Sequence, residues 1–203
     1  MLIYVEFISR RAFVPLDRFH AVAGRAQAEW AQRHGDDQII LNVGRSWRVG
    51  PEPEYMCVWY TPGSGLERID DWERSFHEAA EIDHHAQFAS VARIDRAGCY
   101  QPVGQPTAGT EGRFLVEWLS CDGVTDEQLK LTFERRGQRH TGRTLRCLAR
   151  PLGALAPGSR AFAVWGLASW GDAPALACDI PDIESGIRVV DAGLYADLGD
   201  EQL

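Results

Sequence analysis

Four short segments in the first half of this 203-residue sequence recur in the second half, in the same order. The matched segments are residues 5–9 with 116–120, 32–34 with 138–140, 58–59 with 164–165, and 97–100 with 192–195. The separation between the copies falls from 111 to 106 and then to 95 residues, so the second copy is shorter in two places. Several collinear matches indicate an internal duplication, and a repeated unit narrows the possible folds more than any other feature of this chain.

Both copies predict the same order of elements, β-α-β-β-α-β, which is the ferredoxin-like unit. In the first copy we expect strands over residues 2–9, 38–47, 54–61 and 91–100, and helices over 15–34 and 65–88. In the second copy we expect strands over residues 113–120, 144–150, 160–168 and 187–195, and a helix over 125–140. The second helix of this copy is shortened, because Pro174 and Pro181 fall in the window left for it.

The repeat also predicts how the chain is divided. We expect a first ferredoxin-like repeat over residues 1–103, a solvated linker rich in Pro, Gly and Thr over 104–112, and a second repeat over 113–203. A single unit covers one face of its sheet with helices and leaves the other apolar face exposed. Two units can bury these faces against each other, so the predicted fold class is α+β, with the repeats packed as an intramolecular α/β barrel.

The charge balance limits the partners. Asp and Glu number 29 against 21 Lys and Arg, and the resulting net charge of −8 disfavours nucleic acid. No apolar run approaches the roughly 18 residues of a membrane span, and no secretory signal is recognisable, so we expect no membrane partner and a cytoplasmic location. All basic residues except Lys130 are arginine, as is typical of GC-rich bacterial genomes. We expect a small-molecule substrate, with homodimer formation left open.

The cysteines and histidines do not form a recognised metal motif. Five cysteines are spread along the chain without any C-x-x-C pair: Cys57, Cys99, Cys121, Cys147 and Cys178. An odd and scattered set favours free buried thiols in a reducing compartment over a zinc ribbon or a disulfide scaffold. The acidic and histidine-rich residues 77–85 match no named zinc motif, so we expect no metal, with a metal site as the alternative.

The chain resembles the dimeric α/β-barrel superfamily in its tandem form. The resemblance rests on the repeated element order, on residues 55–60 (YMCVWY) before a helix, and on residues 84–88 (HHAQF) leading into the last strand of the first copy. These segments are similar to those of small polyketide cyclases, EthD-like proteins and the NIPSNAP group. The resemblance implies a ligand cavity lined by aromatic residues, either between a sheet and its helices or within the barrel.

The resemblance further implies a catalytic histidine at the entry to the last strand of the first copy. Matching Phe88 to the apolar residue after this histidine favours His85, with His84 next. From the residues alone, Glu6 and its repeat counterpart Glu117 interrupt strands whose two faces are both apolar, and burial is expected to raise the pKa of each carboxyl. Glu6 would then serve as base or as the charged partner of the histidine. The alternative is that each carboxylate pairs with an arginine.

Aromatic and polar residues near these positions are candidates for ligand contacts. Tyr60 joins the predicted catalytic set, because its hydroxyl would position the ligand. The predicted substrate-binding residues are Tyr4, His20, Trp59, Trp72, Phe88, Tyr100 and Glu117. For the tryptophans the alternative is core filling, and for the tyrosines it is burial with satisfied hydrogen bonds.

This set predicts a cofactor-independent isomerase, cyclase or lyase that moves protons on an apolar cyclic or aromatic small molecule. No cofactor is expected for such a reaction. A ligand-binding or stress-response barrel protein without turnover is the first alternative, and a cofactor-free or heme-dependent monooxygenase is the second. The sequence contains neither G-x-S-x-G nor G-x-G-x-x-G, so a serine hydrolase and a Rossmann dehydrogenase are not expected.

Overall fold

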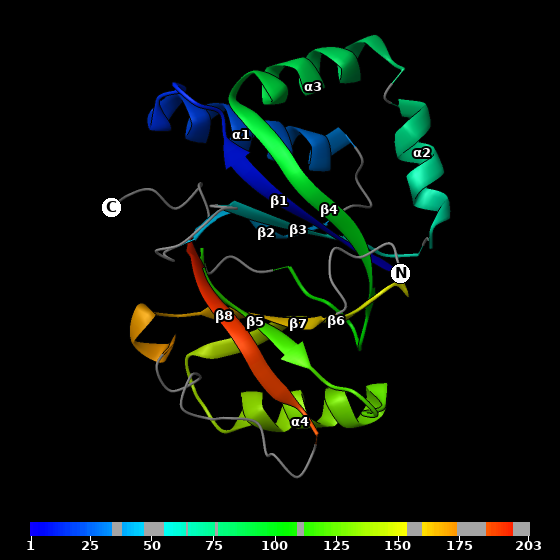
Figure 1. The fold of residues 1–203 in the computed structure, drawn as a ribbon, viewed down its shortest axis with the longest axis vertical. Coiled ribbons are helices and arrows are strands. Elements are labelled where there is room, and N and C mark those ends of the chain that lie inside the picture. The colour runs from blue at the N-terminus through cyan, green and yellow to red at the C-terminus, as the bar shows by residue number, and fades with distance from the viewer. Residues whose placement is uncertain are drawn as a thin grey trace.

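The computed structural model describes residues 1–33, 38–46, 55–63, 65–75, 77–108, 112–153, 160–173 and 186–196. These residues form an α+β fold in which an antiparallel sheet carries helices on its outer faces (Figure 1). The elements in chain order are β1 (Leu2–Arg10), α1 (Leu16–Arg33), β2 (Gln38–Ser46), β3 (Tyr55–Thr61), α2 (Glu67–Ser75), α3 (Ala79–Val91), β4 (Ala92–Pro102), β5 (Arg113–Ser120), α4 (Asp126–Gln138), β6 (Arg143–Pro151), β7 (Ala161–Leu167), the short 3-10 helix η2 (Trp170–Asp172) and β8 (Arg188–Ala196). The predicted α+β class is therefore confirmed.

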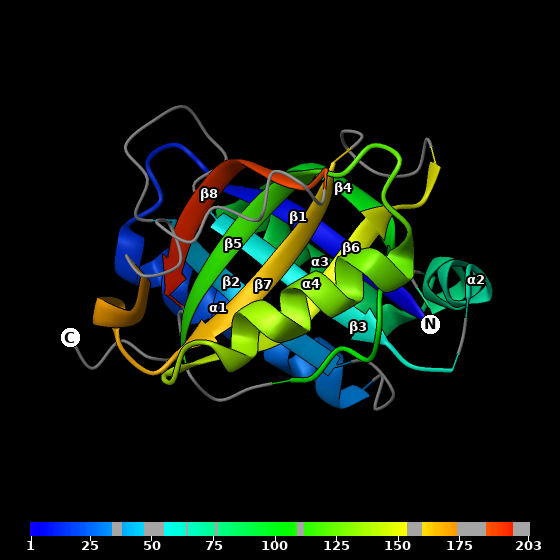
Figure 2. The same ribbon diagram turned by 90° about the horizontal axis from the view of Figure 1, so that it is seen from below.

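The strands close on themselves in the order β1-β3-β2-β8-β5-β7-β6-β4. The first four strands of the chain form one half of the barrel and the last four the other, and the halves join where β2 pairs with β8 and β4 pairs with β6. Helices α1 and α3 cover the outside of the first half, and α4 crosses the outside of the second half (Figures 1 and 2). Helix α2 lies beside the first half rather than across its sheet (Figure 1).

The two halves pair their strands in the same register. The matched central pairs are Val5↔Val58 with Val116↔Val164, and Val5↔Gly98 with Val116↔Gly193. An irregularity interrupts the pairing of β1 with β4 after Phe7, and the same irregularity interrupts the pairing of β5 with β8 after Trp118. Equivalent positions can therefore be compared between the halves residue by residue.

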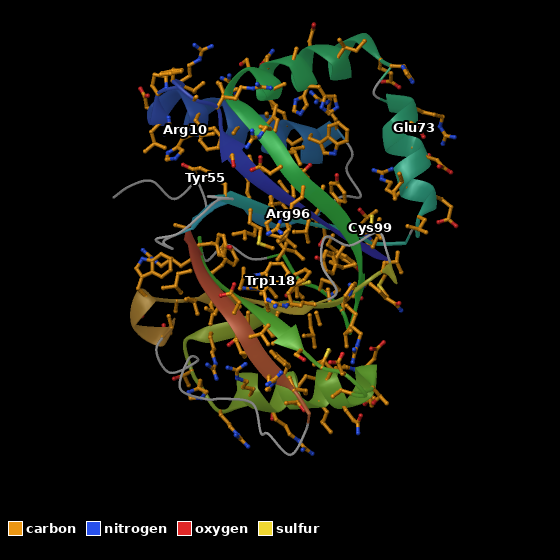
Figure 3. All side chains as sticks on the ribbon, viewed as in Figure 1. Arg10, Tyr55, Glu73, Arg96, Cys99 and Trp118 are labelled. Carbon is orange, nitrogen blue, oxygen red and sulfur yellow. The ribbon has the colours of Figure 1, made fainter. Side chains whose placement is uncertain are left out.

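Alternation along each strand sorts the side chains into three packed clusters. One cluster fills the inside of the barrel and includes Val5, Val58, Tyr100 and Phe162. The other two lie between each half-sheet and its helices. Trp118 packs against the inner cluster and lies between the two half-sheets (Figure 3). The barrel interior is thus a core of tightly packed apolar side chains, and polar chemistry is placed on the helix sides.

Local signals explain where the helices begin. Helix α4 starts after Thr125, whose hydroxyl accepts a hydrogen bond from the backbone N–H of Gln128 at 3.2 Å, while the Gln128 side chain accepts from the Thr125 N–H at 2.9 Å. This capping box satisfies N–H groups that have no partner inside the helix. Leu129 and Phe133 then face the sheet of the second half.

Two expected segments differ from the structure. The helix predicted over residues 65–88 is two helices, α2 and α3, and α3 continues three residues further, to Val91. The linker predicted over residues 104–112 is not a solvated connection throughout. The Thr107 N–H donates to the Arg146 carbonyl at 2.9 Å, and Pro106 is buried. The start of this segment is therefore held against β6 by a backbone hydrogen bond.

Tyr100 gives a test of the barrel interior. Its side chain is fully buried, and its hydroxyl has no hydrogen-bond partner among the described residues. Because removal of an unsatisfied buried hydroxyl relieves a desolvation cost, Tyr100→Phe is expected to raise the free energy of unfolding by about 1 kcal/mol. Urea unfolding at neutral pH measures this. Tyr60→Phe is the control and should destabilise, because the Tyr60 hydroxyl accepts a 2.8 Å hydrogen bond from Gln105.

Tyr100 should also make the stability of the protein depend on pH. Burial raises the pKa of the Tyr100 phenol to about 12, with Arg96 opposing the shift. The unfolded chain therefore loses this proton before the folded protein does, and wild-type stability should fall as the pH rises from about 10 to 12. The Tyr100→Phe variant should lose less stability over this window. An equal loss in both proteins, or a variant as unstable as Tyr60→Phe, would contradict the assignment.

Candidate functional site

The first half carries a buried carboxylate on the helix side of its sheet. Glu6 is only 8% exposed, and its Oε2 accepts a hydrogen bond from the Trp59 indole N–H at 3.3 Å. Tyr4 and Glu6 are two residues apart on β1 and share this face, as predicted. Trp59 belongs to the packed cluster beneath the helices, and Tyr4 packs against it. Three of the predicted site residues are therefore brought together.

Tyr4 is held as a neutral phenol. Burial raises the pKa of its hydroxyl well above the usual value, and the negative charge of Glu6 and the nearby thiols of Cys99 and Cys57 raise it further. The phenol therefore keeps its proton across the physiological range. It can donate a hydrogen bond at this face but cannot act as an anionic base near neutral pH.

Two histidines lie against a tryptophan between α1 and α3. His84 is buried and His85 is half-buried, and their rings lie 5.8 and 5.4 Å from the Trp30 indole, centroid to centroid. The two imidazoles are 5.5 Å apart in an edge-to-face arrangement. Both histidines lie within the helix predicted over residues 65–88, and α3 continues beyond them for more than one turn before β4 begins. They are presented by the helix face that packs toward α1.

Two further predicted site residues, His20 and Phe88, are buried on the same side of the sheet. His20 is buried on α1, and its Nε2 lies 3.4 Å from the Tyr55 hydroxyl, which Figure 3 shows beneath the helix. Phe88 is buried in the same cluster as Trp30 and Trp59. We name this face, with Glu6, Trp59, Trp30, His84 and His85 at its centre, the first-half helix face. The side chain of Trp72 lies outside what the structure describes.

The matching face of the second half is closed by an ion pair. Both Glu117 oxygens accept hydrogen bonds from the Arg136 guanidinium, at 2.7 and 2.9 Å, and the Trp165 indole donates to Glu117 at 2.8 Å. The side chains of Arg136 and Glu117 are 4% and 2% exposed. Glu117 is thus the arginine-paired carboxylate of the alternative interpretation. We find no ligand-binding role for it in this arrangement.

Tyr60 and Tyr100 do not join the first-half helix face. Both are buried in the inner cluster, because they follow Trp59 and Cys99 along their strands and alternation turns them into the barrel. The Tyr60 hydroxyl lies 3.3 Å from the Met1 sulfur as well as accepting from Gln105. The expected joint action of Tyr60 with His85 and Glu6 is therefore not supported by the geometry.

Sequence reasoning missed two residues that decide the character of these faces, Trp30 and Arg136. They occupy the same place in the repeat, since the 106-residue separation that relates Trp59 to Trp165 also relates Trp30 to Arg136. The signal was present in the sequence. An arginine at an apolar position of a helix, in the copy whose glutamate it neutralises, predicts the ion pair, and a tryptophan at that position predicts a face without one.

The described residues include buried cysteines but no cluster of side chains that could bind a metal ion. Cys57, Cys99, Cys121 and Cys147 are buried thiols outside any disulfide, as predicted, whereas Cys178 lies outside the described residues. Over the described ranges, no three or more His, Cys, Asp or Glu side chains gather closely enough to hold a metal ion. None of the described helices is long and apolar enough to cross a membrane.

No family model matches the sequence, and no curated protein matches it. Solved structures do share its fold. A heme-binding protein from Thermus thermophilus is 11% identical with a TM-score of 0.60, over 96% of this chain and 90% of the other. A chlorite dismutase variant from Candidatus Nitrospira defluvii, solved with cyanide, is 9% identical with a TM-score of 0.60, over 97% and 91%. A protein from Lactobacillus acidophilus assigned as a monooxygenase is 9% identical with a TM-score of 0.61, over 96% and 92%.

The fold is ferredoxin-like. These similarities establish the fold across nearly the whole chain, but they do not extend to the EthD-like, NIPSNAP and polyketide-cyclase relatives expected from the sequence. They also overturn the predicted function. The structural neighbours include a heme-binding protein, chlorite dismutases and an assigned monooxygenase, so the predicted cofactor-independent isomerase, cyclase or lyase is contradicted.

Proposed function

We propose that this chain is a heme-binding oxidoreductase that holds heme at the first-half helix face. The observation that carries the proposal is the pair of imidazoles, His84 and His85, which α3 presents against the buried indole of Trp30. The heme-binding protein and the chlorite dismutase among the structural neighbours support the choice of group. The assigned monooxygenase supports an oxidation as the class of reaction.

The donor set of this face fits heme. A histidine imidazole is the axial ligand of many heme proteins, and His84 and His85 are the imidazoles of this face. Trp30 and Phe88 belong to the apolar cluster beside them and would line a bound porphyrin. The second half offers no such set. Its only histidine is His140, beyond the end of α4, and Arg136 fills the matching place.

Each polar residue of the first-half helix face would have its own role in heme binding. One imidazole of the pair would hold the iron, and the other would orient it or hydrogen-bond to a ligand. Tyr4 remains protonated and can donate a hydrogen bond at the same face. Glu6 fixes the Trp59 indole through its N–H. Heme, when bound, supplies the redox chemistry of its iron.

Hemin titration tests the proposal. Hemin added to the purified protein should give a shifted, saturable Soret band with a stoichiometry of one per chain. Loss of an outer-shell partner weakens a metal site about 10–100-fold. The double variant His84→Ala, His85→Ala should weaken hemin binding by more than this. The two single variants identify the ligand, because only its loss should change the Soret position.

His77→Ala is the matched control. His77 is exposed and lies outside α3, so its removal should leave hemin affinity unchanged. Chlorite consumption by the hemin-loaded protein tests the enzymatic part separately. An unshifted Soret band in wild type, or equal binding by the double variant, would refute the heme site. Heme binding without turnover on chlorite or with peroxide would instead support the non-catalytic binding protein.

We also propose that residues 1–103 and 113–203 are copies of one ancestral unit that share the barrel. The matched registers, the matched irregularities after Phe7 and Trp118, and the repeated indole-to-glutamate hydrogen bond support this duplication. Free cysteines support a cytoplasmic location for the protein.

A further inference from the structure

A cavity of about 440 Å³ opens at one end of the second half, away from the first-half helix face. Figure 2 shows the end of β5 meeting the starts of β7 and β8 there. The cavity is lined by Ser120 and Cys121 on and after β5, by Arg150 and Pro151 of β6, by Arg160 before β7, and by Arg188 and Val190 of β8, among others. Three arginines therefore line one pocket in a chain whose net charge is −8.

The three arginines are not equally compensated. Arg150 is already held, because its Nε lies 2.6 Å from an Asp126 carboxylate oxygen and its Nη1 donates to the Cys121 sulfur at 3.2 Å. Arg160 and Arg188 have no carboxylate partner within the part of the chain that the structure describes. Asp122 is the acidic residue that lines the pocket, and it is exposed. The pocket thus has positive charge that the described protein groups leave unneutralised.

In the first half, a carboxylate neutralises the arginine at the position equivalent to Arg188. There the Ser9 hydroxyl donates a hydrogen bond to Asp95 Oδ2, and the Arg93 Nε lies 2.5 Å from Asp95 Oδ1. Ser9 and Arg93 are paired across β1 and β4, as Ser120 and Arg188 are paired across β5 and β8. Asp95 lies in the irregularity of β4, and the residue in the same irregularity of β8 is Val190. The second half has kept the serine and the arginine but lost the carboxylate.

We propose that this pocket binds a small organic acid, whose carboxylate takes the place between Ser120 and Arg188 that the Asp95 carboxylate takes in the first half. A guanidinium and a hydroxyl are matched donors for the two oxygens of a carboxylate. Arg160 adds a second cation for an acid with two carboxylates, and Val190 and Pro151 supply an apolar wall for the carbon chain. This site is independent of the proposed heme site.

Isothermal titration calorimetry with succinate, on protein without hemin and at constant ionic strength, tests the inference. Wild type should bind one succinate per chain. Arg188→Gln should weaken binding at least tenfold. Val190→Asp should abolish it, because it restores an internal carboxylate at the place where the ligand would lie. Both positions are exposed, so both variants should keep the wild-type circular dichroism spectrum, which is recorded for each.

Arg93→Gln is the matched control, since it makes the same change at the equivalent position of the first half. It should leave the succinate affinity within twofold of wild type. Inorganic phosphate, titrated in parallel, distinguishes a carboxylate site from a general anion site. The inference is overturned if wild type does not bind succinate, if Val190→Asp binds it as well as wild type, if Arg93→Gln weakens it as much as Arg188→Gln, or if phosphate binds more tightly.

Discussion

Replacing Arg136 with alanine is expected to lower the free energy of unfolding by about 3–5 kcal/mol. The guanidinium makes two hydrogen bonds to Glu117, and both side chains are almost completely removed from water. In the variant the Glu117 carboxylate would stay buried. It would lose both hydrogen bonds from the guanidinium and keep the one from the Trp165 indole. A buried charge that has lost its counter-ion costs far more than an exposed ion pair gains.

Urea unfolding at neutral pH measures this effect, and a surface pair provides the control. Arg25 and Glu29 form an exposed i, i+4 pair at 3.7 Å, and Arg25→Ala should change stability by less than about 1 kcal/mol. The double variant Glu117→Gln, Arg136→Met should recover more than half of the loss, because neither position then carries a charge and the glutamine still accepts from Trp165. If Arg136→Ala is no more damaging than Arg25→Ala, the pair does not stabilise the second half.

The contrast between the two helix faces shows why the site was only partly predictable. Strand alternation is a local property, so the sequence correctly placed Tyr4 and Glu6 on one face. The pairing of Glu117 with Arg136 depends on a helix packing across the sheet, and no local pattern reports which of many arginines will lie there. Only the repeat, by matching Trp30 to Arg136, contained that information.

Helix boundaries limited the rest of the prediction. A continuous apolar periodicity over residues 65–88 does not reveal the break between α2 and α3, and it ends before the last turn of α3. The prediction did place His84 and His85 on this helix, but it did not show that they pack against Trp30 of α1. The strands were predicted to within one or two residues, because short β-branched and aromatic runs have sharp ends.

The function was harder to predict than the fold for a physical reason. The same titratable residues, imidazoles and a buried carboxylate, serve proton transfer and metal ligation alike. A sequence lists these groups but does not say whether an iron or a substrate lies between them. The geometry does show that Tyr60 points into the barrel, so the aromatic neighbour of the two histidines is Trp30 and not Tyr60.

Phe162→Ala is expected to lower the free energy of unfolding by about 3–5 kcal/mol and to weaken both halves of the molecule together. Phe162 lies on β7 in the second half and is fully buried. Its ring contacts Tyr100 of the first half edge-on, with centroids 4.9 Å apart, and Trp118 of the second half at 5.3 Å. A cavity at this place would remove contacts across the boundary between the halves.

Hydrogen exchange separates this result from a local effect. Because one cluster inside the barrel draws on strands of both halves, the halves should unfold in one transition. The backbone amides of β3 belong to the first half and do not pair with β7, yet they should lose as much protection in the variant as the amides of β7. Leu131→Ala on the exposed face of α4 should change neither. Loss of protection confined to β5, β6, β7 and β8 would mean that each half is stable alone, and the barrel would then be two docked domains rather than one folding unit.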